Sequence, residues 1–263
     1  MKNQIESLME AHVKVQIGTY FSDCKQIEGS VIKYAYSKKI EDFYWNYAYN
    51  INCAIDKLPE EIQRIRDFSK EINRECTIYV TSETNPKNIA EIINPLELEE
   101  EVWMIYNEKN IEIENSKLRI EIIKNDIPSS TFMEIFDNSY SEAEEGATGY
   151  TGLPKEYLDC ISNSKPASGV TSAHFIGIDN DNIPSAVASI FMFNGYAGLY
   201  NVGTHHDKRR KGFGAEISKQ AISYALKNNC HTLFLQTQAD SEVEELYSKI
   251  GFKRLFIGKF IKI

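Results

Sequence analysis

Long hydrophobic segments are missing from this sequence. Even the apolar stretches 186–188 and 190–193 are short, and Ser189 separates them. A membrane-spanning helix needs about 20 consecutive apolar residues, whereas a strand needs only about five. We therefore expect strands from these stretches, and neither a membrane span nor a membrane partner.

Cysteine is sparse and follows no pattern. The chain has five cysteines, and no two of them form a C-x-x-C pair or a metal-ligand spacing. An odd and dispersed set is typical of reduced thiols, and no signal-peptide pattern is recognised, so we expect a cytoplasmic protein without a metal site. The cysteines are Cys24, Cys53, Cys76, Cys160 and Cys230.

Positive charge is in deficit. The chain has 29 Lys and Arg against 38 Asp and Glu, which gives a formal net charge of −9. An acidic surface repels nucleic acid, so we expect no nucleic-acid partner. The acidic excess lies almost entirely in residues 1–116 (the first half), whereas residues 117–263 (the second half) are close to neutral. This asymmetry suggests two domains with these bounds.

The second half shows a readable order of strands and helices. Asn194–Gly195 separates two strand-like runs, and this dipeptide favours a tight antiparallel hairpin. The order of elements is typical of an α+β fold with helices on a mixed central sheet. The expected strands are 118–123, 171–179, 185–193, 196–204, 232–237 and 252–263, and the expected helices begin near residues 129, 154, 214 and 241.

The first half echoes the second half. When residues 60–84 are aligned with 214–238, helix falls on helix, strand on strand, and Cys76 on Cys230. This agreement favours an old duplication, and a chance similarity between two helix–strand units is the alternative. The cations and glycines near residue 210 have no counterpart in 52–61. The first copy is therefore expected to lack the chemistry that they perform.

The segment THHDKRRKGFGAEI, residues 204–217, sets four consecutive cations against two glycines. It contains R-x-x-G-x-G and joins an expected strand to an expected helix. Glycines let backbone N–H groups converge, and a helix N-terminus adds partial positive charge, so the segment suits a phosphate or pyrophosphate. The P-loop and dinucleotide-binding patterns are absent. A basic patch for a polyanion and a solvated turn are the alternatives.

Two motifs at their usual separation resemble the GNAT superfamily of N-acetyltransferases. The first is the strand and [QR]-x-x-G-x-[GA] loop in NVGTHHDKRRKGFGAEI (201–217), and the second is LYSKIGF (246–252), which matches L-Y-x-x-x-G-F. The resemblance covers about residues 117–263. It implies a GNAT acetyltransferase domain there, a degenerate GNAT-like domain at 1–116, and acetyl-CoA as a cosubstrate served by the four cations.

The resemblance also implies roles for individual residues. Main-chain groups of 202–204 would bind the pantetheine arm, and the amides of 209–215 would hold the pyrophosphate. Tyr247 would lie near the sulfur, and Asp240 stands where many members have an Asn near the pantetheine. The implied cofactor-binding residues are Val202, Gly203, Thr204, Arg209, Arg210, Lys211, Gly212, Phe213, Gly214, Ala215 and Asp240.

The implied reaction is direct attack of a neutral amine on the thioester. A backbone N–H near Val202 or Gly203 would polarise the carbonyl, and Tyr247 would protonate the departing thiolate. A core tyrosine is the alternative for Tyr247. For the general base, His205 and His206 titrate in the right range but are expected to be solvated, and water is a further candidate. Candidates by location alone are Glu144, Glu145 and Tyr150.

The sequence thus predicts a cytoplasmic N-acetyltransferase that acts on a primary amine of a small molecule or peptide, with a homodimer as its expected assembly. A non-catalytic acyl-CoA-binding or regulatory module is the alternative. The acidic first half either steers a cationic acceptor to the site or is the solvated surface of a domain that braces the fold. The bracing role is favoured, because the acidic run 96–101 has the composition of an exposed segment.

Overall fold

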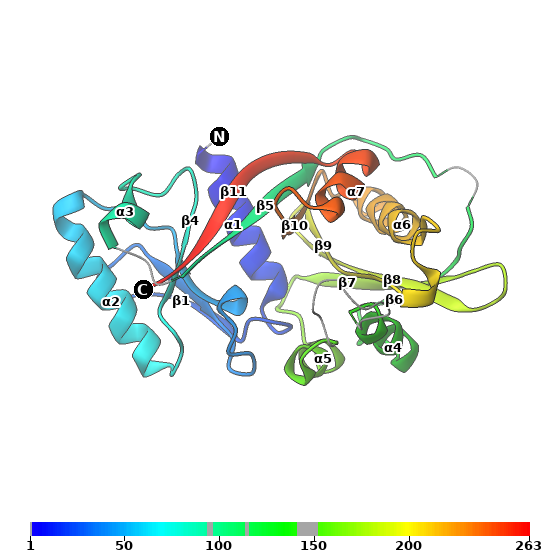
Figure 1. Cartoon of the computed structure of the whole chain (residues 1–263), viewed down its shortest axis with the longest axis horizontal. Coiled ribbons are helices and arrows are strands. Elements are labelled where there is room, and N and C mark those ends of the chain that lie inside the picture. Colours follow the sequence, from blue (N-terminus) through cyan, green and yellow to red (C-terminus); the bar gives the residue numbers. More distant parts are fainter. Residues whose placement is uncertain (1, 94–96, 114–115, 141–151) are drawn as a thin grey trace.

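The structure is a computed structural model of the chain, and it describes residues 2–93, 97–113, 116–140 and 152–263. Its strands form one sheet in the order β1-β2-β3-β4-β11-β5-β10-β9-β8-β7-β6 (Figure 1). The strands are β1 (Asp23–Gln26), β2 (Lys33–Tyr36), β3 (Asn46–Tyr49), β4 (Thr77–Val80), β5 (Glu97–Tyr106), β6 (Arg119–Lys124), β7 (Thr171–Ile178), β8 (Pro184–Phe193), β9 (Tyr196–Thr204), β10 (Thr232–Gln238) and β11 (Lys253–Lys262). The helices are α1 (Lys2–Gln16), α2 (Leu58–Glu71), α3 (Ile89–Ile93), α4 (Ser130–Asn138), α5 (Lys155–Ser162), α6 (Phe213–Lys227) and α7 (Glu242–Ile250).

The second half has the predicted α+β order. Strands β6, β7, β8 and β9 form an antiparallel meander, and β9 is followed by α6 and then by the parallel strand β10. Asn194 and Gly195 join β8 to β9 with φ angles of 47° and 80°. Both values are positive, as the tight hairpin turn requires. The mixed sheet with flanking helices is therefore confirmed.

The two halves exchange strands at the centre of the sheet. β5 belongs to the first half, yet it pairs with β10 of the second half. β11 belongs to the second half, yet it pairs with β4 of the first half. β5 and β11 also pair with each other along most of their length, and they run side by side through the middle of Figure 1. The halves thus share one continuous sheet, and their division at residues 116 and 117 stays a prediction.

One succession of strand, helix, parallel strand and helix occurs in both halves. In the first half, β3 leads through α2 to the parallel strand β4 and then to α3. In the second half, β9 leads through α6 to the parallel strand β10 and then to α7. The alignment of helix on helix and strand on strand is therefore confirmed. It sets β3 and β4 of the first half opposite β9 and β10 of the second.

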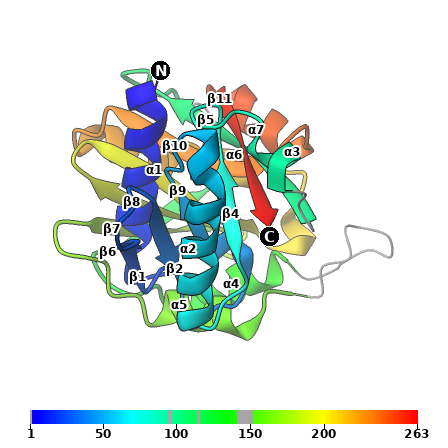
Figure 2. The same ribbon diagram turned by 90° about the vertical axis from the view of Figure 1, so that its left-hand side faces the viewer.

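Helix α1 binds the two halves together. Its apolar face, which includes Leu8 and Val15, packs in one cluster with Tyr47 of the first half and with Phe191 and Phe234 of the second. Helices α6 and α7 pack on the opposite face of the second half, and α2 covers the first half (Figure 2). Among the described residues, no helix combines the length and the apolar character that a bilayer span requires.

Candidate active site

Strands β9 and β10 separate after a short paired stretch. Their registered pairs run only from Tyr196 and Thr232 to Gly198 and Phe234. Within the part of the chain that the structure describes, residues 199–204 of β9 have no strand partner on the side of β10. Backbone N–H and C=O groups require hydrogen-bond partners, so this open edge can bind an extended, amide-bearing ligand.

A β-bulge interrupts β9 beside this split. Val187 of β8 is in register with Gly203, and Ser189 is in register with Tyr200, so the register shifts between the two pairs. Asn201 lies at the shift in the left-handed conformation, with a φ of 52°, which asparagine tolerates better than most residues. A bulge redirects the main chain of the strand that contains it. The redirected segment is the one expected to bind the pantetheine arm.

The end of α4 closes one side of the split. A Cβ atom on Gly203 would lie 2.4 Å from the Ser139 Oγ, so glycine is what lets α4 approach β9 this closely. The Arg209 guanidinium donates to the Ser139 carbonyl oxygen at 2.7 Å. The loop after β9 and the end of α4 therefore converge beside residues 202–204.

Helix α6 begins with N–H groups that no side chain caps in the described structure. Gly212 is the N-cap residue, with a φ of 87° and no side chain to accept from these groups. The first-turn carboxylate of Glu216 instead accepts from the N–H groups of Lys117 and Leu118, each at 3.0 Å. The start of α6, from Phe213 to Ala215, therefore has the electrostatics of an anion site. The Phe213 ring itself is buried in the core.

The four cations of the loop have different surroundings. Lys208 forms a buried ion pair with Asp179, with 2.6 Å between Nζ and Oδ2. This contact holds the pKa of Asp179 at about 2. Lys208 therefore anchors the loop to the end of β7, which corrects the expectation that all four cations serve one ligand. Arg210 and Lys211 are exposed beside the start of α6.

Tyr247 lies on α7 with its ring in the core and its hydroxyl group near α6. The ring packs edge-on against Phe252, with centroids 5.8 Å apart. Burial raises the pKa of the phenol well above its ordinary value, and Tyr140 adds to the rise while a hydrogen bond with Ser218 opposes it. The structure thus brings the Tyr247 hydroxyl group to Ser218 on α6, and the ring contributes to the core, whereas the expected place near the sulfur stays a prediction.

Asp240 faces an ion network at the start of α7. Its Oδ1 accepts from Arg254 at 2.7 Å, and its own N–H donates to Glu244 at 2.7 Å. Arg254 pairs with Glu244 as well. A contact between Asp240 and the pantetheine would compete with this network for the carboxylate, and the contact stays a prediction.

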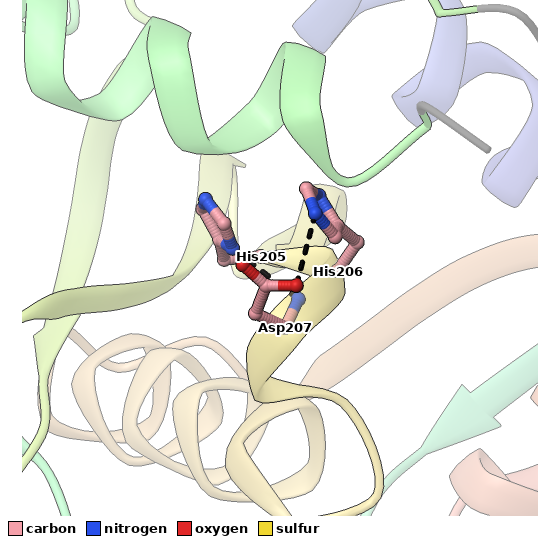
Figure 3. A group of neighbouring side chains, drawn as sticks. All are labelled: His205, His206 and Asp207. Carbon is pink, nitrogen blue, oxygen red and sulfur yellow. Dashed lines mark hydrogen bonds and ion pairs between the residues drawn. The ribbon is translucent and has the colours of Figure 1, made fainter. Parts of the chain in front are cut away.

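His205, His206 and Asp207 cluster at the end of β9 (Figure 3). Their three ligand-type atoms lie within 4.8 Å of one another, a set that suits a divalent transition metal by type. However, His206 is engaged at both ring nitrogens, by Asn138 at 2.6 Å and by Asp207 at 3.0 Å. Asn138 also accepts from the His206 backbone N–H. His206 therefore fastens the loop to the end of α4 rather than being merely solvated.

Two residues beside the split, Asn201 and Tyr140, were not among the predicted site residues. Asn201 stands within a β-forming stretch, and this placement is the signal that indicates a bulge. Tyr140 directly follows Ser139 and raises the pKa of Tyr247. The base candidates Glu144, Glu145 and Tyr150 lie outside the described residues.

In the first half, Asn85 bonds to the strand edge at the corresponding split. β3 and β4 have one registered pair, Ala48 with Ile78. Beyond it, the Asn85 backbone donates to the Ile51 carbonyl at 3.1 Å and accepts from the Cys53 N–H at 3.2 Å. The Asn85 side chain donates to the Cys53 carbonyl at 2.8 Å. The Ile51 carbonyl and the N–H and carbonyl of Cys53 are thus already bonded, whereas the edge of β9 has no such partner among the described residues.

Comparisons with known proteins agree with this geometry. The sequence model of the Acetyltransferase (GNAT) family matches residues 131–252. The uncharacterized N-acetyltransferase YobR of Bacillus subtilis (strain 168) is 30% identical over 126 residues, which are 48% of this chain and 46% of that protein. The chain therefore matches about half the length of this curated relative.

Solved structures share the fold across both halves. A GCN5-related N-acetyltransferase from Kribbella flavida superimposes with a TM-score of 0.66 at 14% identity, over 95% of this chain and 93% of that one. A tandem GNAT protein from the clavulanic acid biosynthesis pathway gives 0.61 at 10% identity, over 88% and 78%. The stretch that is similar to the Acetyltransferase (GNAT) family, residues 131–252, contains both the β9/β10 split and the uncapped start of α6.

Proposed function

We propose that this protein is an acetyl-CoA-dependent N-acetyltransferase that acts on a primary amine of a small molecule or peptide. The observation that carries the proposal is the meeting of the β9/β10 split with the uncapped start of α6. The split offers main-chain groups to an extended arm that contains amides. The helix start, with exposed Arg210 and Lys211, offers N–H groups and positive charge to a pyrophosphate.

The pantetheine arm lies along 202–204 and the pyrophosphate at 209–215 in this proposal. Glycine is favoured at two points of the path. A Cβ on Gly214 would lie 3.2 Å from the Thr204 Oγ1, and Gly212 needs a positive φ. The backbone can therefore approach a phosphate closely where a side chain would stand in the way.

The reaction is direct transfer. A neutral amine attacks the thioester carbonyl carbon, a C–N bond forms, and a backbone N–H just after the bulge stabilises the oxyanion. The C–S bond then breaks, and Tyr247 gives its proton to the thiolate. The phenol is protonated at neutral pH, and because burial raises its pKa, the phenolate left after the transfer takes up a proton from water, which restores the acid. The excess proton of the attacking amine leaves to water.

Release of free CoA thiol with a panel of primary amines tests this proposal. We expect amine-dependent release, and we expect Tyr247→Phe to lower kcat by on the order of 100-fold, as loss of a general acid does. The dissociation constant of CoA should stay within about twofold, because binding energy comes from the loop and the split. Tyr224→Phe, on α6 against Phe175, is the matched control and should retain activity.

Two outcomes would contradict the proposal at different points. Tight CoA binding without thiol release for any amine would favour a non-catalytic acyl-CoA-binding module. Unchanged kcat in Tyr247→Phe would leave the transferase intact but assign Tyr247 to the core alone.

The first half serves as a brace in this proposal rather than as a second transferase. Asn85 occupies the main-chain groups of its split, and the first turn of α2 carries Glu60 and Glu61, which repel phosphate. We further propose a cytoplasmic location, which the five free cysteines support.

A further inference from the structure

A residue of the first half forms a hydrogen bond with the β-bulge of β9. The Tyr20 hydroxyl, in the turn after α1, donates to the Asn201 Oδ1 at 2.7 Å. The Asn201 Nδ2 donates to the Ser189 Oγ at 3.2 Å. The Asn201 side chain is therefore held at both ends, by the first half on one side and by β8 on the other.

The hydrogen bonds continue into the sheet with a consistent direction. The Ser189 Oγ lies 2.8 Å from the His174 Nδ1, and both residues are buried. Burial lowers the pKa of His174 to about 4, so the imidazole is neutral at pH 7 and Nδ1 can accept from the serine hydroxyl. Each group from Tyr20 to His174 thus donates to the next. Such fully satisfied buried chains fix the conformation of their members.

Tyr20 is itself rigidly placed. Its ring stacks on Trp45 with centroids 4.2 Å apart, and the residue is 3% exposed. The turn that carries it is bonded to the segment after α5, where the Lys165 N–H donates to the Gly18 carbonyl at 2.8 Å. A Cβ on Gly18 would lie 1.9 Å from the Lys165 oxygen, so only glycine allows this contact.

Tyr20 also lies at the edge of the proposed reaction site. Tyr140 raises the pKa of both Tyr20 and Tyr247, after the larger effect of burial on each. Tyr140 therefore lies within electrostatic range of both Tyr20 and Tyr247. Asn201 is the residue in the left-handed conformation there, and Val202 is the next residue along β9.

We propose that Tyr20, a residue of the first half, is a positioning residue for acetyl transfer, which holds the bulge at Asn201 and so aims the backbone N–H groups that follow it. This inference rests on the proposed function and gives the bracing half a specific task. Without the Tyr20 hydroxyl, the Asn201 Oδ1 loses its hydrogen-bond donor. The bulge then shifts, and the backbone N–H groups after Asn201 no longer point at the oxyanion. The start of α6 is untouched, so CoA still binds.

Steady-state kinetics of Tyr20→Phe, with the full-length chain, test this inference. The substitution keeps the ring on Trp45 and removes only the hydroxyl group. We expect kcat to fall about tenfold or more, because misaimed oxyanion donors cost that much, while the dissociation constant of CoA rises by a clearly smaller factor, because the contacts at the start of α6 are kept and only those of 202–204 are disturbed. Tyr34→Phe, in the α2-side core of the first half, is the control and should retain full activity.

A double-mutant comparison gives the sharper result. Asn201→Gly keeps the left-handed backbone accessible and removes the acceptor, so adding Tyr20→Phe to it should lower kcat no further. Independent, multiplying losses in the double variant would overturn the inference, as would an unchanged kcat in Tyr20→Phe.

A second measurement separates this inference from the proposed function. The backbone amide NMR signals of residues 201–203 should shift in Tyr20→Phe, and those of the α6 start should not. If wild-type protein transfers acetyl to no amine, the proposed function fails. Unmoved signals at 201–203 would overturn the positioning role whatever the activity.

Discussion

Glu101 is a half-buried carboxylate whose surroundings oppose its charge. Its Oε1 accepts from the Tyr79 hydroxyl at 2.7 Å and from the Trp103 indole N–H at 3.0 Å, near the crossing of β5 and β11. Burial raises the pKa of Glu101 to about 7, and these two hydrogen bonds only partly offset the rise. The carboxyl group therefore titrates near neutrality in the folded chain and near its ordinary pKa in the unfolded chain.

The free energy of unfolding should therefore fall as the pH rises from the unfolded-state pKa of Glu101 through its folded-state pKa. Between its unfolded pKa and pH 7, the unfolded chain loses this proton while the folded chain keeps it, so the contribution is full below about pH 4.5 and is lost through pH 7. We expect a loss on the order of 2 kcal/mol between pH 5 and pH 8 from this group.

Denaturant unfolding of Glu101→Gln at both pH values checks the pH dependence. The amide keeps an acceptor oxygen for Tyr79 and Trp103 and cannot ionise, so the variant should lose less stability than wild type by about that amount. Glu245→Gln, at an exposed position on α7, should behave as wild type. Equal losses in wild type and Glu101→Gln would refute the assignment.

At the scale of elements, the two splits differ in the features that the proposed CoA site needs. β3 and β4 separate as β9 and β10 do, but Asn85 already bonds to Ile51 and Cys53 in the first split. The helix starts differ as well, because α2 has Pro59 and two glutamates where α6 has Gly212, Gly214 and cations. The first half therefore differs from the proposed site at both the strand edge and the helix start.

Local signals in the sequence predict most elements of the second half. Asn194–Gly195 forms the expected hairpin, and Ser129 caps α4 by accepting from the Phe132 N–H. These features depend on neighbouring residues alone, so a single sequence contains them. The loop 209–215 is predicted for the same reason, because its glycines and cations are consecutive.

Long-range pairings could not be predicted in this way. The exchange of β5 and β11 joins segments far apart in the sequence, and the composition of either strand suits several partners. The Tyr20 and Asn201 pair spans 181 positions, so no local pattern indicates it. Helix α1 was not predicted, because its role is to cover strands of both halves, which only the assembled sheet reveals.

On the scale of the whole molecule, the shared sheet makes the halves interdependent. The edge of β10 is covered by β5, and the face that contains Phe191 and Phe234 is covered by α1, so the first half supplies both covers. A cut at the predicted division between residues 116 and 117 would thus remove the strand and the helix that cover the sheet of the second half.

Expression of residues 117–263 alone measures this interdependence. We expect a fragment without cooperative unfolding and with poorly dispersed amide NMR signals, because an uncovered strand edge and an uncovered apolar face remain. Co-expression with residues 1–116 should restore a dispersed spectrum and CoA binding. A fragment that folds cooperatively and binds CoA alone would show that the halves are independent domains.

Calorimetric titration of the full chain with CoA tests the central claim most directly, namely that a single CoA site lies at the β9/β10 split and the start of α6. The account predicts one CoA per chain, and binding weakened at least about 100-fold in Gly212→Glu, which places a side chain and a negative charge where a glycine with positive φ faces the phosphates. Lys57→Glu, at the corresponding helix start of the first half, should leave binding unchanged. Two CoA molecules per chain, or an unchanged dissociation constant in Gly212→Glu, would contradict it.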